Sequence, residues 1–366
     1  MVTTANCRRI CAWPALLLGV MIVVCLGLAA TPALGNRAER RGARVHRFHG
    51  SHRSHRVPTG RARPSHPPRA VASIVGGAGA SIAGFPFQVA LYDPHAGSPS
   101  AGFFCGGVII DATHVATAAH CIATGSHGQV GALGEIEVLA GSTRLTPTDP
   151  GSVRDPVVAA AFDPHYNPST SDFDVGVLTL ARRLWSGSTP PSVNGISTIA
   201  PLPVNVAEAA GYTVQKAEQT IMATVSGWGD VNPAPSAGPS YPADLQSAQV
   251  PLVPEWLCGE NYAAIEQTIT PRMICAGNSK RRTDSCYGDS GGPLVVDRDT
   301  PADPPGDYVL VGLVDFGNGC AQPGYPGVYT RIGNPEVAGF LASNVDHNAK
   351  LAGRRTRKGR KRRRRH

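Results

Sequence analysis

Residues 288–293 read Gly-Asp-Ser-Gly-Gly-Pro, and this stretch decides how the rest of the chain is interpreted. Glycines at 288 and 291 flank Ser290 and allow a sharply turned backbone to approach a bound molecule closely. A nucleophilic serine needs a neighbouring base, a carboxylate that orients the base, and backbone N–H groups aimed at the developing oxyanion. If Ser290 is such a nucleophile, the chain has to supply a histidine and an acid elsewhere.

Two other segments carry candidate partners for Ser290. His120 lies in the run Thr-Ala-Ala-His-Cys at 117–121, in which small neighbours leave room beside the imidazole. Asp174 begins the run Asp-Val-Gly-Val-Leu at 174–178. Taken alone, His120 also fits a packed or surface histidine, and Asp174 a cap or turn residue.

The composition favours a turn-rich all-β body with a large core. The chain has 366 residues, 42% of them hydrophobic, with 42 Gly and 32 Pro. Short apolar or alternating runs recur between Gly and Pro turns, which is typical of an all-β sandwich or barrel. The expected strands cover residues 88–92, 108–110, 114–118, 135–140, 175–180, 222–226, 293–297, 308–314 and 327–332.

One helix is expected near the end of the body. Asn334 is a candidate N-cap and Pro335 a candidate first helical residue. Val337, Phe340 and Leu341 follow at helical spacing, which predicts an amphipathic helix that closes the domain.

The two segments before residue 74 differ from the body. Residues 1–35 combine Arg8 and Arg9 with an apolar stretch and a small-residue end, which predicts a secretory signal peptide. An uncleaved signal anchor is the alternative. Residues 36–73 are rich in Arg, His, Ser and Pro, which predicts a basic disordered propeptide or a linker that the mature protein keeps.

The cysteines and charges also divide along the chain. Three of the nine cysteines fall within 1–35, which leaves an even set of six in an exported body, with 15 possible pairings. The net charge of +8 conceals a body, residues 74–349, with 11 basic and 25 acidic residues, a net charge of −14. An acidic globule therefore lies between two basic tails.

The motifs around His120, Asp174 and Ser290 resemble, in this order, those of the chymotrypsin/trypsin family, and the small set of six cysteines resembles in particular that of its secreted bacterial members. The resemblance runs from about Ile74 to Asp346. It implies two six-stranded antiparallel β-barrels with the site between them and a C-terminal helix. The expected domain covers residues 74–349.

The resemblance also implies a role for each motif residue. Ser290 would attack the carbonyl carbon of a peptide bond, His120 would take and return the proton, and Asp174 would hold the imidazole tautomer. The N–H groups of Gly288 and Ser290 would form the oxyanion hole. No cofactor is expected.

Ile74 and Asp289 are implied as an activation pair. Ile74-Val-Gly-Gly resembles the mature amino terminus of the family, whose new ammonium pairs with the aspartate before the nucleophile. We therefore expect a zymogen whose pocket around Asp289 is poorly formed before cleavage. Ser73 precedes Ile74, so a tryptic enzyme would cut after Arg69, and another protease or later trimming is required.

Asp284, six residues before Ser290, is expected to set substrate preference. In trypsin-like members an aspartate at this position binds the Arg or Lys side chain of the substrate, and Gly317 and Gly327 match the wall glycines that keep the slot open. Cleavage after Arg or Lys follows, with a surface aspartate as the alternative. The family also implies the disulfides Cys105–Cys121, Cys258–Cys275 and Cys286–Cys320.

Asp315 departs from the family pattern. Val-Asp-Phe-Gly at 314–317 stands where the family usually has Ser-Trp-Gly. If Asp315 lies beside Asp174, one carboxyl has a raised pKa or holds a proton, which shifts the pH optimum or cripples the proposed catalysis. The resemblance also places Tyr287 at the rim of the substrate pocket.

The remaining features concern partners. Residues 350–366 form a polybasic, disordered tail without aromatics, so specific nucleic-acid binding is not expected, and anionic cell-surface polymers or lipids are candidate partners. Polypeptides are the expected substrates of a secreted monomer. The alternatives are a catalytically impaired homologue that binds peptides or surfaces, and a polycationic surface protein. Glu135 and Glu137 are weak evidence for calcium, and no metal is expected.

Overall fold

The computed structural model describes residues 74–345 apart from 125–128, 132, 148, 188–191, 194–195, 198–201, 214–219, 233–237, 278–281 and 299–305. The expected signal peptide, propeptide and polybasic tail lie outside the described residues. No helix within the described residues has both the length and the apolar character that crossing a membrane requires.

The first barrel is closed and antiparallel. Its strands follow the order β2 (Gln88–Tyr92), β3 (Phe103–Ile109), β4 (His114–Thr117), β9 (Gly176–Leu180), β8 (Val153–Phe162) and β7 (Glu137–Ala140), and β7 pairs with β2. Two short hairpins accompany it, β5 (Ala123–Thr124) with β6 (Gln129–Val130) and β10 (Ser192–Val193) with β11 (Ile196–Ser197).

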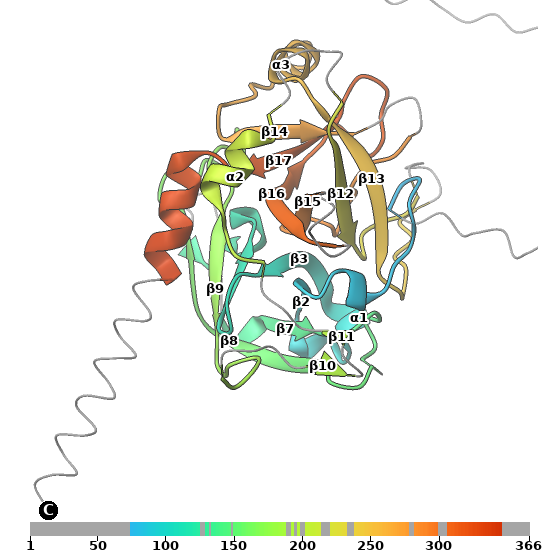
Figure 1. Cartoon of the computed structure of the whole chain (residues 1–366), viewed down its shortest axis with the longest axis vertical. Coiled ribbons are helices and arrows are strands. Elements are labelled where there is room, and N and C mark those ends of the chain that lie inside the picture. Colours follow the sequence, from blue (N-terminus) through green and yellow to red (C-terminus); the bar gives the residue numbers. More distant parts are fainter. Residues whose placement is uncertain are drawn as a thin grey trace, which may run out of the picture. The chain divides into compact units, whose positions relative to one another are not determined.

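The second barrel has the same number of strands in its ring. The order is β13 (Gln246–Val253), β12 (Met222–Gly227), β15 (Pro293–Asp297), β16 (Tyr308–Phe316), β17 (Gly327–Arg331) and β14 (Met273–Ala276), and pairing of β13 with β14 closes it. The short β1 (Ala78–Gly79) adds to the outside of β13. Figure 1 shows this barrel above the first.

Strand alternation builds two cores at once. In β2, Val89 and Leu91 pack into the interior of the first barrel, whereas Ala90 and Tyr92 belong to the larger cluster shared with the second barrel. Because successive strand residues point to opposite faces, one strand serves both cores. The predicted fold of two six-stranded antiparallel barrels is confirmed.

Helices lie at the margins of the barrels. They are α1 (Pro99–Gly102), α2 (Val206–Gly211), α3 (Glu255–Ala263) and the helix at 335–345, shown in red in Figure 1. Asn334 Oδ1 accepts the N–H of Glu336 at 2.9 Å, and Val337 and Leu341 are buried. The predicted N-cap and C-terminal helix are therefore confirmed.

Three disulfides brace the loops. Cys105–Cys121 joins β3 to the turn after β4, Cys258–Cys275 joins α3 to β14, and Cys286–Cys320 joins the segment before residue 288 to the loop after β16. These are the pairings that the family resemblance implied.

Candidate active site

The loop 288–293 is shaped by glycine. Gly288 and Gly291 have φ values of 95° and 75°, in the left-handed region that most side chains avoid. A Cβ on Gly291 would lie 2.1 Å from Thr117 Oγ1 and 2.7 Å from the carbonyl oxygen of Gly106. Only glycine lets this loop pack so closely on the first barrel.

Backbone hydrogen bonds hold Ser290 between the barrels. Its carbonyl accepts the N–H of Gly106 at 2.8 Å, and the N–H of Gly291 donates to the carbonyl of Val314 at 2.8 Å. Within the described part of the chain, the N–H groups of Gly288 and Ser290 meet no acceptor. These two donors are free to bind an oxygen atom from outside.

His120 lies in a 3₁₀ turn, Ala119–Cys121, directly after β4. Its Nδ1 is 2.7 Å from Asp174 Oδ2, and its backbone N–H donates to Asp174 Oδ1 at 2.8 Å. The Asp174 side chain is fully buried. The backbone carbonyl of Asp174 accepts a hydrogen bond from the hydroxyl of Thr330 at 2.6 Å. One carboxylate thus holds both the ring and the backbone of His120.

This contact determines which nitrogen of His120 carries hydrogen. An ionised carboxylate only accepts, so Nδ1 is the donor and Nε2 is left for a proton from outside. Burial alone lowers the pKa of His120, but the charge and hydrogen bond of Asp174 raise it above the ordinary value. The imidazole is therefore suited to take up a proton.

One cavity of about 260 Å³ joins these groups to Asp284. Asp284 is only 3% exposed; its Oδ2 accepts the N–H of Ala321 at 2.9 Å, and its buried Oδ1 has no hydrogen-bond partner among the described residues. Burial raises the pKa of Asp284 to about 7. The other lining residues that the sequence singled out are His120, Ser290, Tyr287, Asp315, Gly317, Gly327 and the disulfide-bonded Cys286 and Cys320.

The wall glycines keep this cavity open. A Cβ on Gly327 would lie 2.6 Å from Asp284 Oδ1, and one on Gly317 would lie 2.9 Å from the carbonyl oxygen of Gly319. A side chain at Gly327 would therefore occupy the space beside the unpartnered carboxylate oxygen.

Comparison with known proteins agrees with this geometry. A family model described as Trypsin matches residues 74–335. The chain is 36% identical to transmembrane protease serine 9 of Rattus norvegicus over 72% of its own length and 21% of that protein. It is 34% identical to a trypsin of Saccharopolyspora erythraea and 33% identical to trypsin-1 of Astacus astacus, over 71% of its own length and 93% and 95% of theirs. The chain belongs to the trypsin family.

The protein is thus a serine-type endopeptidase, an enzyme that acts on polypeptides. It spans about a fifth of the rat relative, at 21%, but over nine-tenths of the other two. The identities of 33% to 36% favour none of these relatives over the others.

Asp289 of the protease is buried without a cation. Its oxygens accept the N–H groups of Gly229 and Cys286, both at 2.9 Å, and burial raises its pKa to about 7. No Lys, Arg or His in the described ranges pairs with it. Ile74 is also fully buried, with its nitrogen in the peptide bond to Ser73. In this uncut chain, backbone donors hold Asp289, and the expected change of the pocket on cleavage stays a prediction.

Asp315 lies beside Asp174, the arrangement that the sequence analysis considered. Its carboxylate, that of Asp174 and a ring nitrogen of His120 lie within 4.8 Å of one another. Burial, and then the charge of Asp174, raise the pKa of Asp315 well above its usual range.

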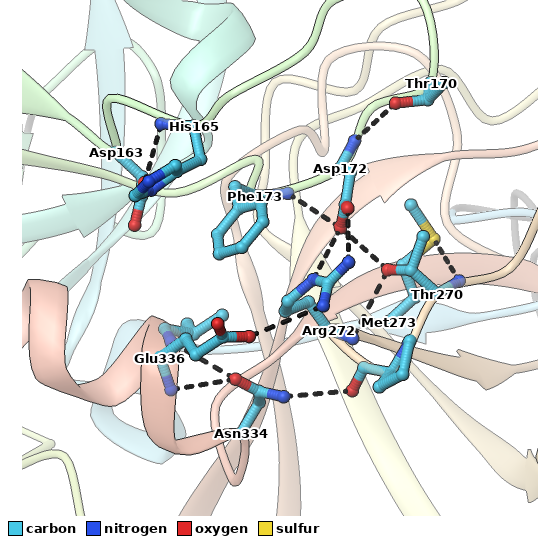
Figure 2. Close-up of polar contacts among 12 residues, drawn as sticks. Asp163, His165, Thr170, Asp172, Phe173, Thr270, Arg272, Met273, Asn334 and Glu336 are labelled. Atoms are coloured by element: carbon cyan, nitrogen blue, oxygen red, sulfur yellow. Dashed lines mark hydrogen bonds and ion pairs between the residues drawn. The ribbon is translucent and has the colours of Figure 1, made fainter.

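A cluster that the sequence did not reveal holds the loop before Asp174 (Figure 2). Ser171 and Phe173 both have positive φ, 56° and 59°, which is unfavourable for side-chain-bearing residues. Asp172, between them, accepts Arg272 Nε at 2.9 Å and the Thr270 hydroxyl at 2.7 Å. The Arg272 guanidinium also lies 4.5 Å from the centre of the Phe173 ring. The second barrel thus stabilises a strained loop of the first.

No local sequence signal predicts this contact, because Asp172 and Arg272 are 100 positions apart.

The weak sequence evidence for calcium at Glu135 and Glu137 can be compared with the structure at Glu137. Glu137 accepts a hydrogen bond from the Tyr92 hydroxyl and pairs with Arg154 at 3.4 Å, so its carboxylate is engaged within the protein.

We expect Arg272→Met to lower the free energy of unfolding by about 1–3 kcal/mol, because it removes hydrogen bonds to a largely buried carboxylate. Although burial raises the pKa of Asp172, Arg272 and Thr270 lower it overall. Arg272 therefore stabilises the fold above the unfolded-state pKa of about 3.9, and the contribution is lost as Asp172 protonates in acid.

Urea unfolding at neutral and acid pH, in a Ser290→Ala background that prevents self-digestion, measures this effect. Arg144→Met is the matched control, since the Arg144–Asp244 pair is 55% and 46% exposed and should change stability little. Equal losses in the two variants would contradict a special role for Arg272.

Proposed function

We propose that the protease cleaves peptide bonds after Arg or Lys, with Ser290 as nucleophile, His120 as base and Asp174 as its orienting acid. The observation that carries the proposal is the shared cavity. His120, whose ring is held by Asp174, and Ser290 line the same space as the buried carboxylate of Asp284. A scissile bond bound there has a cation site on one side and a nucleophile with its base on the other.

The catalytic steps follow from these positions. Ser290 Oγ attacks the carbonyl carbon while His120 Nε2 takes its proton, and the carbonyl oxygen becomes an oxyanion in reach of the Gly288 and Ser290 N–H groups. His120 then gives the proton to the leaving amine, and water repeats the sequence on the acyl-enzyme. Asp174 stays ionised and stabilises the imidazolium.

Asp284 supplies the selectivity. Its free Oδ1 is a hydrogen-bond acceptor for a guanidinium or ammonium group, and such a cation favours the ionised carboxylate, which lowers the raised pKa on binding. An uncharged side chain leaves the buried group unpaired, which costs binding energy.

Activation by cleavage before Ile74 is part of the proposal. Asp289 is buried without a cation in the uncut chain, and a new ammonium at Ile74 is the group that would neutralise it. Residues 74–76 already lie against the pocket, since the N–H of Asp284 donates to the carbonyl of Val75 at 3.1 Å. The pairing would stabilise the pocket further.

The segments outside residues 74–345 complete the proposal. Residues 1–35 would direct export, residues 36–73 would be removed on activation, and the cationic residues 354–365 would bind an anionic cell-surface polymer or lipid. A secreted monomer, in part associated with a surface, is the form we propose. The comparisons do not favour a catalytically impaired homologue.

Hydrolysis of matched arginyl, lysyl, phenylalanyl and alanyl amides by protein processed to Ile74 tests triad and pocket together. We expect kcat/KM for the arginyl amide to exceed that for the phenylalanyl amide by roughly 10³- to 10⁵-fold and Asp284→Ser to remove most of the preference. Ser290→Ala is the inactive control. Preference for an uncharged substrate would contradict the proposed role of Asp284, and a processed parent enzyme without activity would contradict the proposed triad.

Activation is tested with a chain beginning at Ile74 and a chain beginning at Asn36. We expect the first to be roughly 10²- to 10³-fold more active, because its ammonium neutralises an otherwise unpaired buried carboxylate. Asp289→Asn in both chains should bring them to a similar low activity. Equal activity of the two parent chains would reject the switch.

The tail is tested by binding to vesicles with and without anionic lipid and to a carboxylated polymer. We expect retention that weakens as salt is raised and that is lost when the chain ends at residue 349. If the shortened chain binds equally well, the acidic body rather than the tail carries the interaction.

A further inference from the structure

Asp315 is the extra residue of a β-bulge. Val314 pairs with Tyr329 and Phe316 with Val328, so Asp315 has no partner of its own in β17. A bulge re-aims the side chain that it carries. Here the carboxylate lies within 4.8 Å of the Asp174 carboxylate and of His120, in the proposed catalytic site.

The hydrogen bonds around the two acids are unequal. Asp174 accepts two N–H groups of His120, at 2.8 and 2.7 Å, and both favour its charged form. Both oxygens of Asp315 are buried, and no hydrogen bond to them among the described residues meets the geometry of those to Asp174; the Ser171 hydroxyl is near and lowers the pKa of Asp315, but burial and the Asp174 charge outweigh it. Two buried carboxylates this close do not both stay ionised, so the proton belongs on Asp315.

None of the other described groups that face Asp315 supplies a fixed positive charge that would stabilise its ionised form. Asp172 is negative and already binds Arg272, while Ser171, Tyr166 and Tyr262 are neutral. His120, with a ring nitrogen within 4.8 Å of both carboxylates, becomes a cation only when it is protonated itself. Burial and the Asp174 charge accordingly keep the pKa of Asp315 high.

We propose that Asp315 is a neutral carboxylic acid in the working enzyme and donates its proton in a hydrogen bond to Asp174. This inference rests on the proposed function of the site. An O–H···O⁻ bond is short and strong, so it would fix the Asp174 carboxylate and, through it, the ring of His120. Asp315 is then a positioning residue that needs its proton, rather than a second charge that cripples the site.

Infrared difference spectra test the protonation state directly. The parent and Asp315→Asn are compared at about pH 9, both with Ser290→Ala to prevent self-digestion. Asp284 and Asp289, with pKa values raised to about 7, are ionised there. We expect the carbonyl band of a protonated carboxylic acid in the parent and in an Asp284→Asn control, and its loss in Asp315→Asn. A parent without that band would overturn the proposal.

Kinetics of protein processed to Ile74 test the positioning role. Asp315→Asn keeps an N–H donor for Asp174, whereas Asp315→Val has similar size and no donor. We expect Asn to retain kcat within about threefold and Val to lower it roughly tenfold to a hundredfold, a larger effect than that on the KM for an arginyl amide. Equal kcat values for Asn and Val would overturn the role.

The two experiments fail separately. If the parent enzyme cleaves no substrate, the proposed function is wrong, while the infrared band still decides the state of Asp315. If the Val variant does not fold, the infrared comparison and the kcat of the Asn variant still decide the proposal: loss of activity in the Asn variant would overturn it.

Discussion

The close packing of Gly291 against the first barrel is the constraint on which the site depends. A Cβ on Gly291 would collide with Thr117 and the Gly106 carbonyl of the first barrel. The N–H of Gly291 donates to the carbonyl of Val314 in β16 of the second barrel. The residue before it, Ser290, is therefore positioned by both barrels at once. Because His120 lies in the turn that follows Thr117 at the end of β4, the same contact helps to place the proposed base on the side of the cavity where Ser290 lies. Small shifts between the barrels would separate these groups, and the shared core opposes such shifts.

Four buried aspartates then divide the chemistry by what each receives from its surroundings. Among the described residues, Asp174 has two N–H donors from His120, Asp289 has two backbone donors, Asp284 has one oxygen without a partner, and neither oxygen of Asp315 has a partner with hydrogen-bond geometry. A buried carboxylate needs a cation, hydrogen bonds or a proton. In the proposed function, cations come from outside: a substrate side chain beside Asp284 and a chain terminus beside Asp289. The different hydrogen-bond supply is what lets one residue type serve four purposes.

The sequence predicted some strands with their observed bounds and missed others. β2 and β15 have the predicted bounds, whereas β8, β13 and β14 were not predicted. A proline inside a run argues against a strand, and β8 contains Pro156 and β13 contains Pro251, although Ala248, Val250 and Leu252 of β13 are buried on one face. The site motifs were found because they are contiguous in the chain. The Arg272–Asp172 contact was not, because pairing across barrels leaves no trace in local sequence.

The Arg272–Asp172 contact explains how the strained loop at residues 171–173 can hold Asp174 in place. Residues 171 and 173 adopt backbone conformations that cost free energy, and such conformations persist only where surrounding contacts over-determine them. Asp172 is held by three side-chain donor groups of the second barrel, and the Thr330 hydroxyl of the same barrel binds the Asp174 carbonyl. The first barrel therefore contributes the acid, and the second barrel fixes its backbone. Since the Asp315 bulge approaches the same carboxylate from the second barrel, both the backbone position and the surroundings of Asp174 depend on the barrel that also carries Ser290.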